Sequence, residues 1–172
     1  NYEFISNDPL NPVLNSVAVG AAVLSNETIQ RWVQQHQLVV DIVWIIDNSG
    51  SMATFQAILG TNMNLFMNSF LQHYPDFQMA FITTDSPFFV GPSITNATTD
   101  PTLAAHDIID SIGTRGNGHE QGLAMLEDCI DFGDCQNWMR PNAILVGIFV
   151  ADEFDGSPGS WTDYVAAYDA VK

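Results

Sequence analysis

The sequence predicts an α/β fold, in which a doubly wound, mostly parallel sheet carries helices on both faces. Residues 38–46 and 143–150 are nearly continuous apolar runs rich in β-branched side chains, typical of strands buried on both faces. Segments with helical spacing of apolar residues alternate with such runs. This alternation favours right-handed crossovers and a parallel sheet covered on both sides.

The chain divides into two predicted parts, an arm or linker over residues 1–37 and the α/β domain over residues 38–172. We assign no chemistry to the arm. Within the domain, a helix is expected over residues 52–73, followed by a second strand over residues 77–83. The inward face of that first helix is expected to carry Phe55, Ile58, Leu59, Phe66 and Phe70.

Three further helices are expected in the second half of the chain. Asp100 followed by Pro101 is a favourable helix start, because a carboxylate caps the first turn and proline fits within it. A helix is expected over residues 119–130. Ser160-Trp-Thr-Asp163 has the pattern of a capping box, which predicts that the last helix begins there.

The charge balance narrows the range of partners. The chain has 20 acidic residues against 4 Lys and Arg, for a formal net charge of −16. Such a surface repels nucleic acid and anionic membranes, so we expect neither as a partner. No apolar run approaches the ~18 residues that a membrane span needs, so no membrane insertion is expected. An extracellular setting, where salt screens the charge, fits this composition.

The two cysteines, Cys129 and Cys135, lie six positions apart in an acidic stretch. In an oxidising compartment they can close a small disulfide ring, whereas in a reducing one they stay thiols. We predict the disulfide on condition that the protein is secreted.

The strongest chemical signal lies at the ends of the two apolar strands. Asp47, Ser49 and Ser51 follow the first strand directly, and Asp152 follows the strand over residues 143–150. Ligands of such sheets bind beyond the carboxyl ends of the strands. Small oxygen donors gathered there suit Mg²⁺ or Ca²⁺. The alternative reading of the first group is an ordinary capped turn before a helix.

From Val39 to Lys172 the chain resembles von Willebrand factor type A domains, which carry a metal-ion-dependent adhesion site. Asp47, Ser49 and Ser51 match the first metal loop of that family, and Asp152 matches the aspartate of the third. The resemblance therefore implies that these four residues bind Mg²⁺ or Ca²⁺.

The second loop of the family normally supplies a threonine, and here the sequence departs from it. His119 or Glu120 stands at that position, and Thr114 lies farther from the expected helix start. The combined motifs look like a bacterial secreted or surface subset in which Glu replaces the threonine, so we assign Glu120 to the site. The alternative is that Glu120 is an acid in the first turn of a helix.

The resemblance implies a divalent-cation-dependent adhesion or protein-binding module on an extracellular or cell surface. An acidic side chain of the partner would complete the shell of the ion, although the extra charge of Glu120 makes such a partner less favourable. The alternative is a structural subunit of a pilus, filament or virion that contacts neighbouring subunits. The family also continues into at least one more strand, so we expect a domain that lacks its last strand.

No enzymatic activity is expected, because the nearest catalytic patterns are incomplete. His119-Glu120 could open a zinc-protease helix, but position 123 is Leu where the second His is required. A hydrolase nucleophile elbow around Ser49 needs Gly at position 47, which is Asp.

Overall fold

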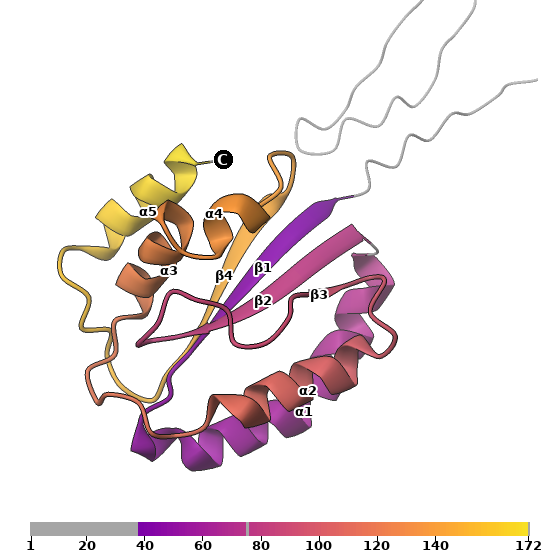
Figure 1. Ribbon diagram of the computed structural model, residues 1–172, viewed down its shortest axis with the longest axis horizontal. Coiled ribbons are helices and arrows are strands. Elements are labelled where there is room, and N and C mark those ends of the chain that lie inside the picture. The colour runs from indigo at the N-terminus through magenta and orange to yellow at the C-terminus, as the bar shows by residue number, and fades with distance from the viewer. Residues whose placement is uncertain (1–37, 75, 172) are drawn as a thin grey trace, which may run out of the picture. The chain divides into compact units, whose positions relative to one another are not determined.

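The computed structural model describes residues 38–74 and 76–171, so the prediction for residues 1–37 lies outside the described residues. Within these residues, four strands form one sheet in the order β3-β2-β1-β4 (Figure 1). β2 (Asp76–Thr83), β1 (Val39–Ile46) and β4 (Ile144–Val150) are parallel, and β3 (Ile94–Thr95) is antiparallel to β2. The predicted α/β class with a mostly parallel sheet is confirmed.

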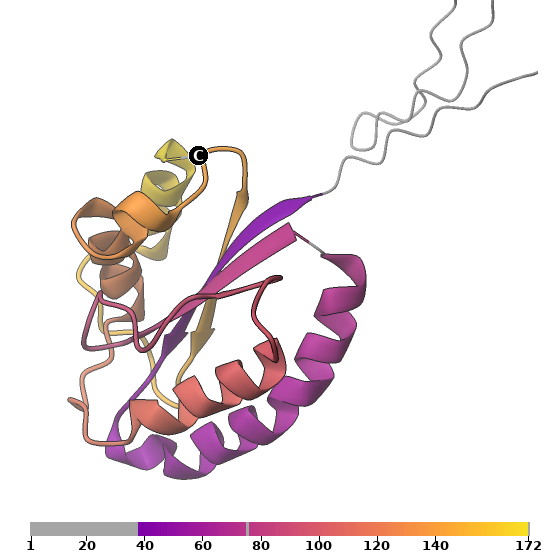
Figure 2. The ribbon, with the colours of Figure 1, turned by 45° about the vertical axis from the view of Figure 1, so that its right-hand side comes forward.

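Helices cover both faces of the sheet, as Figures 1 and 2 show from two directions. The long helix α1 (Ala53–His73), preceded by a 3₁₀ turn over Gly50–Met52, lies with α2 (Pro101–Ile112) on one face. The other face carries α3 (Gly122–Asp131), α4 (Cys135–Trp138) and α5 (Trp161–Ala170). Among the described residues, no helix has the length and apolar character needed to cross a membrane.

β1 is apolar on both faces because each face is buried against a different helical layer. Val40, Ile42 and Trp44 pack into the core beneath α1 and α2. Val43 and Ile45 pack into the second core, with Leu126 of α3. The strand therefore has no solvent face, which explains its continuous apolar sequence.

β4 is equally apolar but lies at the edge of the sheet formed by the described residues. Its side chains are only partly covered, and those of Ile144 and Phe149 are 50% and 43% exposed. An apolar run thus predicts a strand of a parallel sheet without showing whether both faces are buried.

The predicted inward face of α1 is wrong in its first turns. Phe55 and Ile58 are half exposed. The buried positions are Gln56, Gly60, Met63, Met67 and Phe70. Their spacing of four, three, four and three residues follows a regular helical stripe, but its polar, small and methionine residues are less conspicuous than the aromatic ones.

The start of α3 also differs from the prediction. The helix begins at Gly122 rather than at residue 119, with Gln121 at its N-cap. His119 and Glu120 therefore lie in the loop before the helix, and Glu120 is not a first-turn helix acid. Gly122 packs closely on the sheet, since an added Cβ would lie 3.1 Å from Phe149 and 3.3 Å from Ile45.

The two predicted helix starts are confirmed. The Asp100 carboxylate accepts a hydrogen bond from the Leu103 amide at 2.9 Å, with Pro101 in the first turn of α2. At α5, the Asp163 amide donates to the Ser160 hydroxyl, and the Asp163 carboxylate accepts from the Ser160 amide, each at 3.3 Å. This reciprocal pair is the capping box that the sequence predicts.

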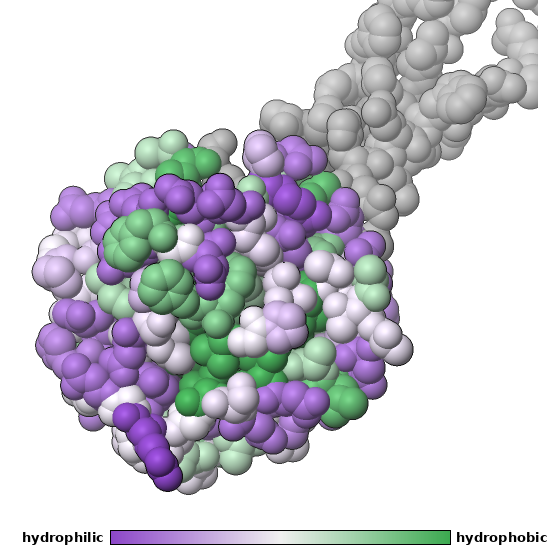
Figure 3. Space-filling model, in the orientation of Figure 1, coloured by the Kyte–Doolittle hydropathy of each residue, from purple (hydrophilic) through white to green (hydrophobic). Residues whose placement is uncertain are grey.

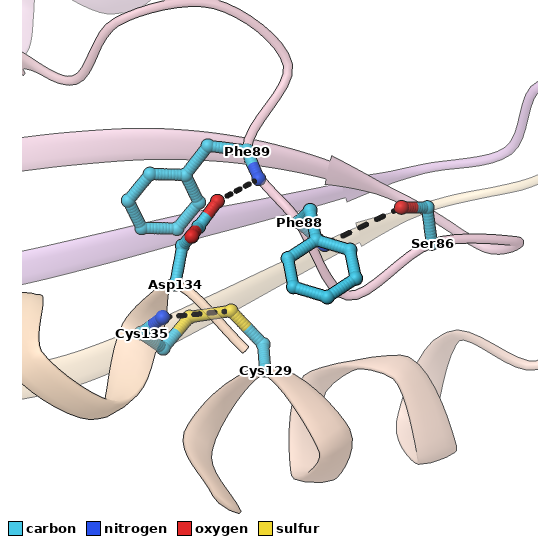
Figure 4. The surroundings of a disulfide bond; sticks show 6 residues. All are labelled: Ser86, Phe88, Phe89, Cys129, Asp134 and Cys135. Atoms are coloured by element: carbon cyan, nitrogen blue, oxygen red, sulfur yellow. Dashed lines mark hydrogen bonds between the residues drawn. A yellow bond between two sulfur atoms is a disulfide. The ribbon is translucent and has the colours of Figure 1, made fainter. Parts of the chain in front are cut away.

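Cys129 and Cys135 form the predicted disulfide, which joins the end of α3 to the start of α4 (Figure 4). The Asp134 carboxylate beside it accepts a hydrogen bond from the Phe89 amide at 2.8 Å. That contact ties the α3–α4 connection to the loop after β2. On the face seen in Figure 3, hydrophilic residues occupy much of the rim around an apolar centre.

Candidate metal centre

The strand register brings three strand ends to one edge of the sheet. Ile46 at the end of β1 pairs with Thr83 of β2 and with Val150 of β4. Two backbone bonds extend this alignment by one residue. The Asp47 amide donates to the Val150 carbonyl at 2.9 Å, and the Thr84 amide donates to the Ile46 carbonyl at 3.3 Å. The segments after β1, β2 and β4 therefore leave the sheet side by side.

Four of the five predicted site residues lie in one chain of short contacts. The Asp47 side chain is fully buried, and its Oδ1 accepts a hydrogen bond from the Ser49 amide at 2.7 Å. The Ser49 and Ser51 hydroxyl oxygens are 3.0 Å apart. Ser51 Oγ donates in turn to Asp152 Oδ1 at 3.2 Å. Residues 101 positions apart in sequence thus meet at the strand ends.

Glu120, the fifth predicted residue, is buried beside this group. It is 3% exposed, and its backbone carbonyl accepts a hydrogen bond from the Gly156 amide at 2.5 Å, in the loop after β4. Burial raises the pKa of its carboxyl group, a backbone hydrogen bond lowers it, and the nearby Asp47, Glu153 and Asp152 carboxylates raise it further. The neighbouring His119 is exposed, with its ring against Gly156.

Two buried carboxylate oxygens at this edge have no hydrogen-bond partner, namely Asp47 Oδ2 and Glu120 Oε1. Leaving a carboxylate oxygen buried and unpaired is costly, so such groups normally pair with a cation or bind a metal. The surrounding donors are carboxylate and hydroxyl oxygens, which Mg²⁺ and Ca²⁺ prefer. The residues present therefore fit a hard divalent cation.

Carboxylates alone do not make the centre. Within residues 38–74 and 76–171, no three side chains of Asp, Glu, His or Cys converge closely enough to hold an ion. A ligand set around Asp47 must therefore include the hydroxyl oxygens of Ser49 and Ser51, or water.

Gln56 supports the first loop, although the sequence analysis did not identify it. Its buried side-chain amide donates to the Asp47 carbonyl at 2.8 Å and to the Gly113 carbonyl at 3.0 Å. It therefore ties the Asp47 loop to the loop before α3. The signal for this role is a polar residue within the buried stripe of α1.

Thr84 is a second residue without a predicted role at this edge. It follows β2, is 4% exposed, and its hydroxyl has no hydrogen-bond partner. The Thr83-Thr84-Asp85 sequence at a strand end is the signal for it, by the same rule that identifies Asp47 and Asp152.

No protein-family model and no curated protein sequence matches the chain. Among solved structures, the fold is similar to part of the pilus adhesin SpaC from Lactobacillus rhamnosus GG, with a TM-score of 0.51 and 17% sequence identity. The match covers 90% of this chain and 21% of the adhesin. At this identity the likeness is one of fold. The resemblance to von Willebrand factor type A domains rests on the sequence motifs.

Proposed function

We propose that this protein is a divalent-cation-dependent module that binds a protein ligand at an extracellular surface. The observation that carries the proposal is Asp47, a fully buried carboxylate with one unpartnered oxygen at the end of the central strand. The Ser49 amide contacts it at 2.7 Å, and the hydroxyls of Ser49 and Ser51 continue the series of contacts to Asp152 at 3.0 and 3.2 Å.

Asp47, Ser49, Ser51 and Asp152 would hold Mg²⁺ or Ca²⁺, with Glu120 contributing directly or through water. When bound, the ion supplies positive charge and a coordination position that an oxygen atom of the partner can fill. Ser51 and Asp152 are exposed, so a partner can reach this side of the centre. Gln56 would keep the first loop in place when the partner binds.

Three observations support an extracellular location. The net charge of −16 suits a medium with salt and divalent cations. The Cys129–Cys135 disulfide is typical of oxidising compartments. The solved structure with a similar fold is that of a bacterial pilus adhesin, and we extend its surface setting to this chain as part of the proposal.

A structural role in an extracellular assembly is the second candidate, and the exposed apolar edge of β4 favours it. Ile144 and Phe149 on this strand are about half exposed, so a neighbouring subunit could cover them. In that case the ion would stabilise the strand-end loops without contacting a partner.

Calorimetric titration with Mg²⁺ and with Ca²⁺ tests the proposal. We expect saturable binding to the wild type and none to Asp47→Asn, which removes the buried charge and keeps the side-chain shape. Asp107→Asn, at an exposed position on α2, makes the same change in net charge and should leave binding unchanged.

Absence of divalent binding to the wild type, or equal binding to Asp47→Asn, would contradict the proposal. The same samples distinguish the two roles by their molecular mass in solution. A binding module should stay monomeric with and without the ion, whereas a structural subunit should associate through β4.

A further inference from the structure

A pocket of about 340 Å³ opens next to the candidate metal centre, between the ends of β1 and β4 and the start of α3. Its size is that of sites for small ligands or single side chains. Its apolar walls include Ile45, Leu123 and Phe149. Asp47, Ser49, Ser51 and Asp152 do not line it, so the pocket lies beside them, and Glu120 is the one residue of the candidate metal centre that also lines the pocket.

The polar groups of the pocket are acceptors of hydrogen bonds. Glu120, Glu153 and Asp155 line it together with Thr84. Glu120 Oε1 and Thr84 Oγ1 are buried with no partner, although the two residues are only 3% and 4% exposed. Two residues that line one pocket thus each carry a buried side-chain oxygen without a partner, and such oxygens are normally satisfied by a hydrogen-bond donor.

The pocket does not suit an anion, although it lies at the start of a helix. The Leu123 amide in the first turn of α3 already donates to Asp155 Oδ2 at 3.0 Å. The Ala124 amide donates to Ser157 Oγ at 2.9 Å. Two of the amides that normally bind an anion at a helix start are thus occupied by the chain itself.

No Lys or Arg is present among the residues that line the pocket. Arg140 lies at the opposite end of β1, where it pairs with Asp41 and Asp76. The three carboxylates of the pocket and the neighbouring Asp47 and Asp152 add up to five negative charges. A divalent ion at the metal centre would neutralise two of them, so a net negative charge remains.

We propose that this pocket binds an alkylammonium group, such as the side chain of a lysine on the partner protein. The apolar walls would cover the four methylene groups, as they do where lysine side chains lie along apolar surface. The ammonium group would donate its three hydrogens to Glu120, Thr84 and Glu153, in which case Glu120 would contribute to the metal centre through water and not as a direct ligand. This inference deepens the proposed function, because it names the chemistry of the partner, and it rests on that function for a partner that docks here.

The test is an NMR titration of the full chain with Nα-acetyl-lysine methylamide, performed once with EDTA and once with saturating Mg²⁺. We expect saturable shifts at residues lining the pocket in both conditions. The matched norleucine compound, which lacks the ammonium group, should bind about tenfold more weakly, since tenfold corresponds to ~1.4 kcal/mol. The matched Nα-acetyl-glutamate compound should not bind.

Glu153→Gln should weaken binding of the lysine compound about threefold, because Glu153 is exposed and an exposed ion pair contributes little. Asp107→Asn, with the same change in net charge on the opposite face of the sheet, should have no effect. Equal binding of the norleucine compound, no binding of the lysine compound, or no effect of Glu153→Gln would overturn the proposal.

The two proposals can fail separately. If no divalent ion binds but the lysine compound does so in EDTA, the metal-dependent function fails and the pocket assignment stands. If the ion binds and the lysine compound does not, only the pocket assignment fails.

Discussion

Two aspartates at opposite ends of β1, Asp41 and Asp47, are both fully buried, but their carboxylates have different partners. Asp41 has a cation beside it, since Arg140 Nε donates to its Oδ1 at 2.8 Å and the Arg140 amide donates to its Oδ2 at 2.7 Å. Asp47 accepts one hydrogen bond, from the Ser49 amide, and its second oxygen has no partner.

The amino end of the strand shows what this fold needs around a buried carboxylate. Arg140 also donates to the Val40 carbonyl at 2.9 Å and to Asp76 at 2.5 Å, so its guanidinium group is bonded on several sides. At the carboxyl end, the Asp47 carboxylate accepts only from the Ser49 amide, the Gln56 amide bonds to its backbone carbonyl, and the acids Glu120 and Asp152 lie nearby. The Asp41 carboxylate is thus balanced within the fold, whereas the Asp47 carboxylate is the one to which we assign a cation from solution in the proposed function.

The largest expected change in stability comes from removing the ion pair between Asp41 and Arg140. Arg140→Met removes the guanidinium group and leaves the Asp41 carboxylate buried without it. We expect the free energy of unfolding to fall by about 3–5 kcal/mol, as for other broken buried ion pairs. Urea denaturation followed by circular dichroism measures this change.

The double variant Asp41→Asn/Arg140→Met removes the charge as well as its partner and should recover much of the lost stability. It also keeps the comparison measurable if Arg140→Met alone does not fold. A loss below about 1 kcal/mol in the single variant would show that the ion pair does not balance the buried charge.

At the carboxyl end of β1, we expect a smaller change in stability and in the opposite direction, namely a gain. In EDTA, Asp47→Asn should raise the free energy of unfolding by about 1 kcal/mol, because it removes a buried charge that lacks a full set of partners. Asp41→Asn under the same conditions should lower it. With a divalent ion at 100 times its dissociation constant, the wild type should gain about 2.7 kcal/mol and Asp47→Asn nothing.

The same two aspartates show which features can be predicted from the sequence alone. Asp47 was identifiable as a candidate site residue because Ser49 and Ser51 follow it closely in sequence. Parallel strands also end at one edge of a sheet, which places Asp152 near it. The partner of Asp41 was not identifiable, because Arg140 lies 99 residues away and no periodicity links them. Contacts that depend on how distant segments pack leave no pattern within either segment.

Similar reasons explain the other differences. Gln56 was missed because the aromatic residues of α1 predicted a different inward face, which left this polar residue outside it. The start of α3 was placed three residues early, because His119 and Glu120 are compatible with a helical turn. In the structure they lie in a loop, where the Glu120 carbonyl accepts a hydrogen bond from the distant Gly156 amide.

The smallest expected change in the free energy of unfolding concerns Glu120, which, like Asp47, has a buried carboxylate oxygen without a partner. Its carboxyl group has an unpartnered oxygen, and burial with the Asp47, Glu153 and Asp152 charges nearby raises its pKa above the ordinary 4.5. The raised pKa means that the ionised form destabilises the folded protein without the ion. In EDTA at neutral pH, Glu120→Gln should therefore raise the free energy of unfolding by up to about 1 kcal/mol.

The destabilisation by ionised Glu120 should depend on pH. Above the raised pKa of the folded protein, Glu120 is ionised in both states and the destabilisation is complete. As the pH falls through that pKa toward 4.5, the folded protein takes up the proton first, so the destabilisation decreases, and below 4.5 it is absent. The stability difference between Glu120→Gln and wild type should accordingly shrink over this window, whereas that of Asp107→Asn should not follow it. A difference that is constant with pH would mean that Glu120 carries no buried charge, and its assignment to the metal centre would lose its physical basis.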